Sequence, residues 1–144
     1  MKPSISSAIA GLLCFSTYVS AQPNRQLYEL QERCGKRAAE VFARDYGYLQ
    51  STKRVDLQHN YQSHYNARLN KCFFVVSTRA IAKSPKDQAV NFIALELYDV
   101  NEKASYGMYN RTLSEKAPTY CAASGRTCSS QEEWEELVHP YMNE

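Results

Sequence analysis

Apolar positions recur at spacings of three and four residues early in the chain, and this pattern predicts an amphipathic helix over residues 25–46. Six of these positions form one stripe: Leu27, Leu30, Cys34, Ala38, Val41 and Phe42. Pro23-Asn24 is a start signal for the helix and Gly47 is a stop signal. The opposite face carries pairs of opposite charge four residues apart, which indicates that it faces solvent.

Gly35 interrupts this predicted helix at a cost of about 1 kcal/mol relative to alanine. It stands next to Cys34, on the apolar stripe. We therefore formulate the hypothesis that the missing side chain lets a strand approach closely enough for Cys34 to form a disulfide.

Alternation with a period of two follows a polar segment, residues 48–58, that is predicted to be a loop. In the first strand Tyr61, Ser63 and Tyr65 share one face, and Gln62, His64 and Asn66 share the other. Further strands are predicted over residues 71–82, 90–100, 105–112 and 120–123, the last of them at an edge. Residues 71–82 are apolar on both faces from Cys72 to Val76, which indicates a central strand.

Short polar segments separate these strands. Residues 67–70 are predicted to connect the first two, residues 83–87 to form a loop in which Pro85 prevents pairing, and residues 101–103 to form a hairpin turn. Gly107 is a candidate β-bulge. In the strand that begins at Val90, the residues Ile93, Leu95 and Leu97 are expected to point inward.

A second helix is predicted over residues 130–142. Ser129 and Ser130 are candidate N-caps, each followed three residues later by a glutamate. One apolar face contains Trp134, Leu137, Val138 and Tyr141, and Pro140 is expected to end or distort the helix. The order of helix, antiparallel strands and helix predicts a single α+β domain over residues 22–144.

Residues 1–21 have the three parts of a secretory signal peptide. Lys2 provides the positive charge, residues 5–15 are apolar, and Val19-Ser20-Ala21 is a cleavage pattern that predicts a mature chain beginning at Gln22. The apolar segment is shorter than the roughly 20 residues of a membrane-spanning helix. Leu13 argues against lipidation of Cys14. The alternative is an N-terminal helix that is not cleaved.

The composition fits one globular domain and offers no basis for nucleic-acid binding. The chain has 144 residues, 44% of them hydrophobic, and a net charge of +2. The charge is uneven, with +6 over residues 22–83 and −5 over residues 84–144. Two interpretations remain open: the asymmetry steers a charged partner, or the acidic C-terminal helix packs near the basic half and cancels it.

Cleavage removes Cys14 and leaves an even number of cysteines, which in an exported domain favours disulfides. These are Cys34, Cys72, Cys121 and Cys128. Three pairings are possible, and the spacing favours Cys34–Cys72 with Cys121–Cys128. A metal site is not expected, because the chain has no CxxC pair and no histidine at ligand spacing beside a cysteine.

No catalytic residue or cofactor is predicted. The chain has no nucleophile elbow and no glycine-rich phosphate loop. His59 and His64 would point to opposite faces of a strand, and so would Glu96 and Asp99. The enzymatic alternative is a small periplasmic hydrolase in which His64 acts with a neighbouring carboxylate or tyrosine. That alternative requires a concave site around His64.

Tyrosines concentrated in the strand region favour binding, because tyrosine is enriched at interfaces. The candidate binding residues are His64, Tyr65, Asn66, Tyr98, Tyr106 and Tyr109. Two structural alternatives compete with this interpretation. Strands favour half-buried aromatic residues in general, and Asn66 and Asn70 suit turn positions.

The segment His64-Tyr65-Asn66-Ala67-Arg68-Leu69-Asn70-Lys71-Cys72-Phe73 resembles a segment of small exported proteins of Gram-negative bacteria. The cysteine in the first helix and the stretch from Cys128 to Met142 are also similar. The resemblance implies a periplasmic or secreted protein and transfers no catalytic residue.

Together these features predict an exported, disulfide-stabilised protein that acts as a non-enzymatic binding or inhibitor-like module. Its partner would be another exported or envelope protein, and no transmembrane segment is expected. A structural envelope protein is a further alternative to the hydrolase.

Overall fold

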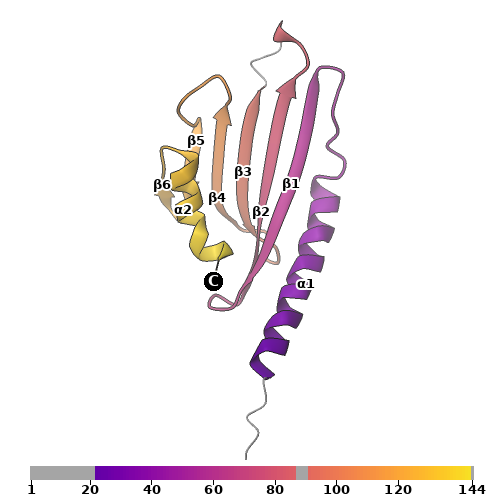
Figure 1. The fold of residues 1–144 in the computed structure, drawn as a ribbon, viewed down its shortest axis with the longest axis vertical. Helices are drawn as coiled ribbons and strands as arrows, with labels where there is room; N and C mark the ends of the chain where they lie inside the picture. The colour runs from indigo at the N-terminus through magenta and orange to yellow at the C-terminus, as the bar shows by residue number, and fades with distance from the viewer. Residues whose placement is uncertain (1–21, 87–90, 144) are drawn as a thin grey trace, which may run out of the picture.

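The computed structural model describes residues 22–86 and 91–143 (Figure 1). A helix α1 (Gln22–Asp45) precedes six antiparallel strands, and a helix α2 (Gln131–Met142) ends the chain. The predicted α+β class is therefore correct. The predicted signal peptide and the start of the third strand at Val90 lie outside the described residues.

The strands form one sheet in which spatial order equals sequence order. They are β1 (Val55–Asn66), β2 (Lys71–Ala82), β3 (Phe92–Asp99), β4 (Ser105–Thr112), β5 (Tyr120–Ala123) and β6 (Arg126–Thr127). The predicted bounds of β2, β4 and β5 are confirmed.

Two predictions about the sheet were wrong. β5 is not the edge strand, because Ser124 and Gly125 adopt positive φ and turn the chain back so that β6 pairs with β5. Residues 55–58 are not loop, because Val55 and Leu57 alternate with exposed polar residues and pair with the end of β2.

The two helices pack on opposite faces of the sheet, and β2 contributes to both interfaces (Figure 1). Phe74 and Val76 pack with the α1 residues Ala38 and Val41. The neighbouring Phe73 packs with Trp134 and Val138 of α2. β2 is therefore the central strand that the sequence predicted, with a core on each side.

Both predicted disulfides are present. Cys34 of α1 is bonded to Cys72 of β2, with Cα atoms 5.4 Å apart, and Cys121 is bonded to Cys128, with Cα atoms 5.0 Å apart. The proposed reason for Gly35 was wrong. A Cβ atom there would lie 3.9 Å from Ser63 Oγ, an ordinary contact, so the disulfide does not require glycine.

Gly107 marks the predicted bulge. Leu97 pairs with Gly107 and Tyr98 with Ser105, so Tyr106 is the extra residue. A Cβ at Gly107 would lie only 2.8 Å from the Cβ of Ala123, which explains the glycine. The bulge directs Tyr106 onto the α2 face, where its ring packs 5.1 Å from Phe73.

α2 begins as predicted and ends later than Pro140. Ser130 is the N-cap and accepts a hydrogen bond from the Glu133 N–H, while the Glu133 carboxylate accepts from the Ser129 N–H and hydroxyl. Pro140 stands in the last turn, where its missing N–H removes one intrahelical bond, and the helix continues to Met142. The Pro140 carbonyl accepts from Asn66 Nδ2 at 2.9 Å.

β1 is an edge strand whose backbone is bonded by side chains of the same chain. Four of its N–H groups donate to side-chain oxygens: Val55 to Thr52, Leu57 to Ser51, Tyr61 to Asn60 and Tyr65 to Gln31. The Gln31 amide also donates to the Ser63 carbonyl. Gln31 therefore bonds to β1 as a peptide group of a neighbouring strand would.

Candidate functional site

The six candidate binding residues do not form one surface. Tyr65 and Tyr98 lie on the α1 face. The other four, His64, Asn66, Tyr106 and Tyr109, lie on the α2 face. Tyr109 is only 2% exposed and Asn66 is fully buried, so neither presents a side chain to a partner.

Asn66 and Asn70 build the turn between β1 and β2, in agreement with the structural alternative. Asn66 Oδ1 accepts a hydrogen bond from the Leu69 N–H. Asn70 has φ of 51°, and its Oδ1 accepts from the Tyr65 hydroxyl at 2.6 Å. The Tyr65 side chain is thus occupied within its own hairpin.

His64 does not lie at a cavity of the kind that the hydrolase alternative requires. Its Nε2 is buried without a hydrogen-bond partner among the described residues. It lines neither of the two cavities described below. His59 lies on the opposite face beside Tyr46, and burial lowers its pKa. Within residues 22–86 and 91–143, no cluster of His, Cys, Asp or Glu side chains has a metal-binding arrangement.

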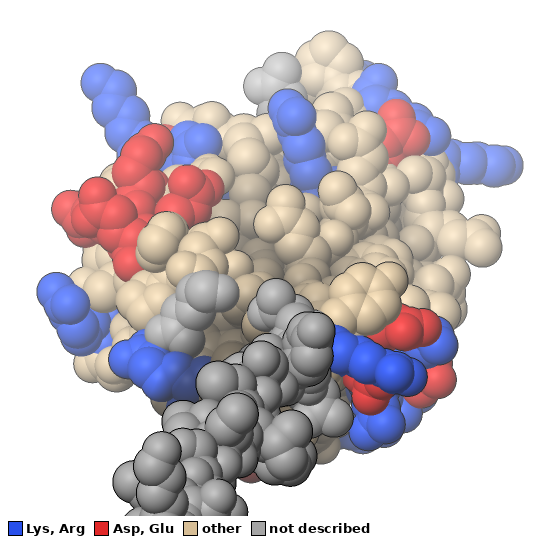
Figure 2. Space-filling model, turned by 60° about the horizontal axis from the view of Figure 1, so that its bottom comes forward, with Lys and Arg blue, Asp and Glu red and all other residues tan. Residues whose placement is uncertain are grey.

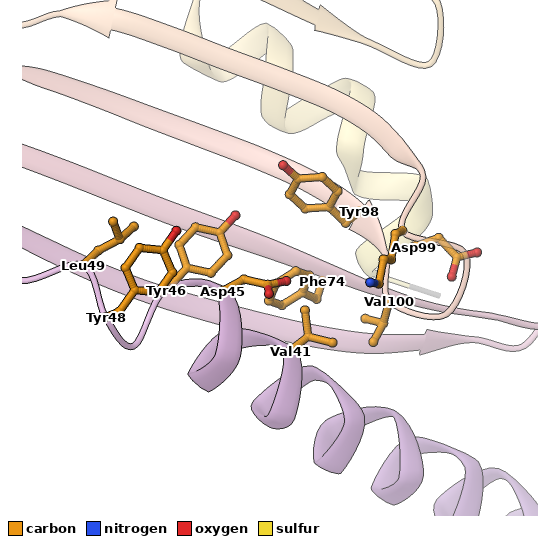
Figure 3. Close-up of a pocket in the computed structure, with 10 residues that line it drawn as sticks. Val41, Asp45, Tyr46, Tyr48, Leu49, Phe74, Tyr98, Asp99 and Val100 are labelled. Carbon is orange, nitrogen blue, oxygen red and sulfur yellow. The ribbon is translucent and has the colours of Figure 1, made fainter.

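An aromatic cavity of about 360 Å³ lies between the end of α1 and the strand β3 (Figure 3). We call it the tyrosine cavity. It is lined by Val41, Asp45, Tyr46, Tyr48, Leu49, Phe74, Tyr98, Asp99, Val100 and Lys103. Phe74, Val41 and Val100 come from the core beneath α1, whereas Tyr48 is 72% exposed at the rim. The volume lies at the lower end of the range for small-molecule sites, about 300–1,000 Å³.

Two tyrosine hydroxyls donate hydrogen bonds to one carboxylate next to this cavity. Tyr98 and Tyr46 both donate to Glu96 Oε2, the latter at 3.3 Å. Tyr46 comes from the residues that follow α1, and Glu96 and Tyr98 lie two residues apart on the same face of β3. The rings of Tyr46 and Tyr98 line the cavity, and Figure 3 shows their hydroxyls directed to the same side of it.

Both phenols stay protonated at neutral pH. Burial and the neighbouring Glu96 charge raise the pKa of Tyr46 to about 12, and the same two causes raise the pKa of Tyr98. The hydroxyls therefore serve as hydrogen-bond donors to Glu96. They are poor general bases and poor nucleophiles, and the arrangement favours recognition over acid–base chemistry.

Asp99 forms hydrogen bonds within the β3–β4 turn, which is another part of the cavity wall. Its carboxylate is 2% exposed, accepts from Lys71 Nζ at 2.9 Å, and accepts from the N–H groups of Asn101 and Glu102 in the β3–β4 turn. Burial alone would raise the pKa of Asp99, but the Lys71 ammonium and the two turn amides lower it below its ordinary value. The turn that carries Val100 and Lys103 is therefore held rigidly.

A second cavity of about 410 Å³ lies on the other face, beside α2. Its apolar walls include Val75, Leu95, Trp134 and Val138, which belong to the core beneath α2, and the rest of its lining is mostly polar. It contains no pair of tyrosines around a carboxylate. The tyrosine cavity is the stronger candidate site for this reason.

The charge asymmetry of the two halves is partly cancelled by contacts between them. Lys71 forms ion pairs with Asp99 and Glu102, at 2.9 and 2.6 Å. At the end of the molecule that carries the β1–β2 and β3–β4 turns, acidic and basic side chains lie next to one another (Figure 2). The acidic partners in these contacts belong to β3 and the β3–β4 turn and not to α2, so the contacts do not test the interpretation in which the C-terminal helix cancels the basic half.

No family model, curated protein or solved structure matches this chain. Over the described residues, neither helix has the length and apolar character that crossing a membrane requires.

Proposed function

We propose that this chain is an exported, disulfide-stabilised binding module whose ligand occupies the tyrosine cavity. The observation that carries the proposal is the combination of a concave aromatic site with two tyrosines that are already hydrogen-bonded to Glu96. Aromatic walls with a few oriented polar groups are typical of ligand sites. Side chains fixed before binding lose little entropy when a ligand arrives.

Export is supported by the signal-peptide pattern of residues 1–21 and by two disulfides, which persist mainly in oxidising compartments. The resemblance of the segment from His64 to Phe73 to small exported proteins of Gram-negative bacteria points the same way. These three features support a periplasmic or secreted location. The partner would be a molecule that meets the protein there, such as another exported or envelope protein that inserts a side chain into the cavity.

A hydrolase that uses His64 has less support. Such an enzyme needs a nearby acid or base and a concave site. The Nε2 atom of His64 is enclosed without a hydrogen-bond partner in the described part of the chain.

Expression of the full chain in a Gram-negative host is expected to yield a protein that begins at Gln22 and contains no free thiol, because export removes Cys14 and oxidises the other cysteines. Intact-mass analysis and N-terminal sequencing of the periplasmic fraction measure both. A protein that keeps residues 1–21 and free thiols in the cytoplasm would contradict the proposed export.

Replacing Leu49 with tryptophan at the rim is expected to block the tyrosine cavity. Leu49 is 36% exposed, so the larger ring can be accommodated without disturbing the core. A library of small neutral and charged compounds, screened by amide chemical shifts, should yield binders that shift Val41, Tyr46 and Val100. Leu49→Trp should weaken those binders at least tenfold, which corresponds to about 1.4 kcal/mol.

Leu27→Trp is the matched control, because Leu27 is 45% exposed on α1 and lies outside the cavity. It should leave binding unchanged. The proposal fails if no compound shifts the cavity residues, or if both tryptophan variants weaken binding equally.

A further inference from the structure

Glu96 is a partly buried carboxylate without a cationic partner in the described part of the chain. Its hydrogen bonds come from the phenols of Tyr46 and Tyr98. A phenol shares its proton with a carboxylate but leaves the negative charge in place. Because an uncompensated charge away from bulk water is costly, a cation that reaches this position is stabilised.

The same hydrogen bonds change the rings that line the cavity. A phenol that donates to a carboxylate takes on part of the electron density of a phenolate, and hydrogen-bonded groups polarise one another in this way. The face of an aromatic ring is already negative, and it attracts a cation placed within about 6 Å of its centroid. Tyr46 and Tyr98 therefore present two rings whose faces favour positive charge.

The other walls determine which kind of cation fits. Val41, Phe74 and Val100 supply carbon surfaces. The two carboxylates that line the cavity are already paired, Asp45 with Arg44 and Asp99 with Lys71. A strongly hydrated ion would therefore lose its water there with few free oxygen ligands to replace it, and the described residues contain no cluster that could coordinate a metal. An ammonium group covered by methyl or methylene groups matches both the ring faces and the carbon surfaces. Its positive charge lies against the tyrosine rings, and its alkyl groups pack on the aliphatic and phenyl side chains.

We propose that the tyrosine cavity binds an organic cation of the alkylated-ammonium class. The nitrogen lies over the rings of Tyr46 and Tyr98 on the side of Glu96, and the alkyl groups pack on Val41 and Phe74. This inference rests on the proposed function and names its ligand class. Both a free small molecule and an alkylated amine on a partner carry this chemistry.

Lys103 is the one cation among the residues that line the cavity. It lies in the β3–β4 turn with φ of 55°, and its charge acts on Asp45, which also lines the cavity. Its ammonium group therefore repels a cationic ligand in the cavity. Lys103→Ala is expected to strengthen cation binding two- to fivefold and to leave the affinity for a neutral ligand unchanged.

Choline and its neutral carbon isostere 3,3-dimethylbutan-1-ol test the charge directly, because the two molecules have nearly the same shape. Titration of the oxidised protein, followed by amide chemical shifts of Val41, Tyr46 and Val100, is expected to show at least fivefold tighter binding of choline. Glu96→Gln keeps the shape of the side chain and removes its charge, so it should abolish this preference. Tyr98→Phe keeps the ring, removes the donated hydrogen bond and should reduce the preference about threefold.

Tyr120→Phe is the control, because Tyr120 is 52% exposed on β5 and does not line the tyrosine cavity. Thermal unfolding of each variant shows that it is folded. Equal binding of choline and the isostere would overturn the inference and leave the proposed binding function standing. If neither probe changes the amide chemical shifts of the cavity residues, the inference is also overturned. The screen of the compound library then tests the proposed binding function separately.

Discussion

Replacing Cys34 and Cys72 together with alanine is expected to lower the free energy of unfolding by about 4 kcal/mol, and replacing Cys121 and Cys128 by about 2.5 kcal/mol. The difference follows from the lengths of the closed loops, whose cysteines lie 38 and 7 residues apart. A longer loop restricts the unfolded chain more strongly. Urea denaturation of both double variants, without reductant, measures the two losses.

Ligand affinity should also differ between these two double variants. Cys34–Cys72 holds α1 on β2, and the end of α1 forms one side of the tyrosine cavity. Ligand affinity should therefore weaken when this bond is removed and persist when Cys121–Cys128 is removed. A larger stability loss for the second pair would contradict the loop-length argument.

Asp99→Ala is expected to lower the free energy of unfolding by about 3 kcal/mol, because the carboxylate is enclosed and hydrogen-bonded to charged and backbone donors. The substitution leaves the N–H groups of Asn101 and Glu102 without their acceptor and removes the buried partner of Lys71. Asp99→Asn keeps an acceptor for the turn and should cost less. Glu102→Gln, at a side chain 61% exposed, is the control and should have little effect.

The Asp99 carboxylate also makes the free energy of unfolding depend on pH in the acidic range. The pKa of Asp99 is lower in the folded protein than in the unfolded chain. The unfolded state therefore takes up its proton first as the pH falls. The stabilisation is complete above about pH 5 and is lost as the pH falls through the folded pKa. Lys71→Met removes a cause of the lowered pKa, so the loss of stability on acidification should be smaller and should be complete at a higher pH. An unchanged acid-unfolding profile would contradict this assignment.

The fold was largely predictable because a strand or helix that is buried on one face or on both has a recognisable pattern of apolar residues in the sequence. β2 showed a run of apolar residues, and β4 was bounded by turns, so their limits were predicted to the residue. β6 carried no such signal, since Arg126 and Thr127 are both exposed and their pairing depends on positive φ at Ser124 and Gly125. The start of β1 was missed because Val55 and Leu57 alone gave too short an alternation.

The site was less predictable, because periodicity tells which face a residue occupies but not what lies over it. Tyr98 was named among the candidates, whereas Tyr46 was not. The hydrogen bond that brings Tyr46 to Glu96 spans 50 residues and depends on the position of α1 over the sheet. One signal was present in the sequence: Glu96 is the one charged residue in the apolar run from Phe92 to Leu97.

The side chains that form hydrogen bonds with the edge of β1 should affect whether the protein aggregates. An open edge strand is a template on which another molecule can add a strand, and this is a common first step of aggregation. In this chain, Gln31, Ser51, Thr52 and Asn60 occupy several of the backbone groups that such a strand would need. Copies at high concentration are therefore expected not to add strands to one another at the β1 edge.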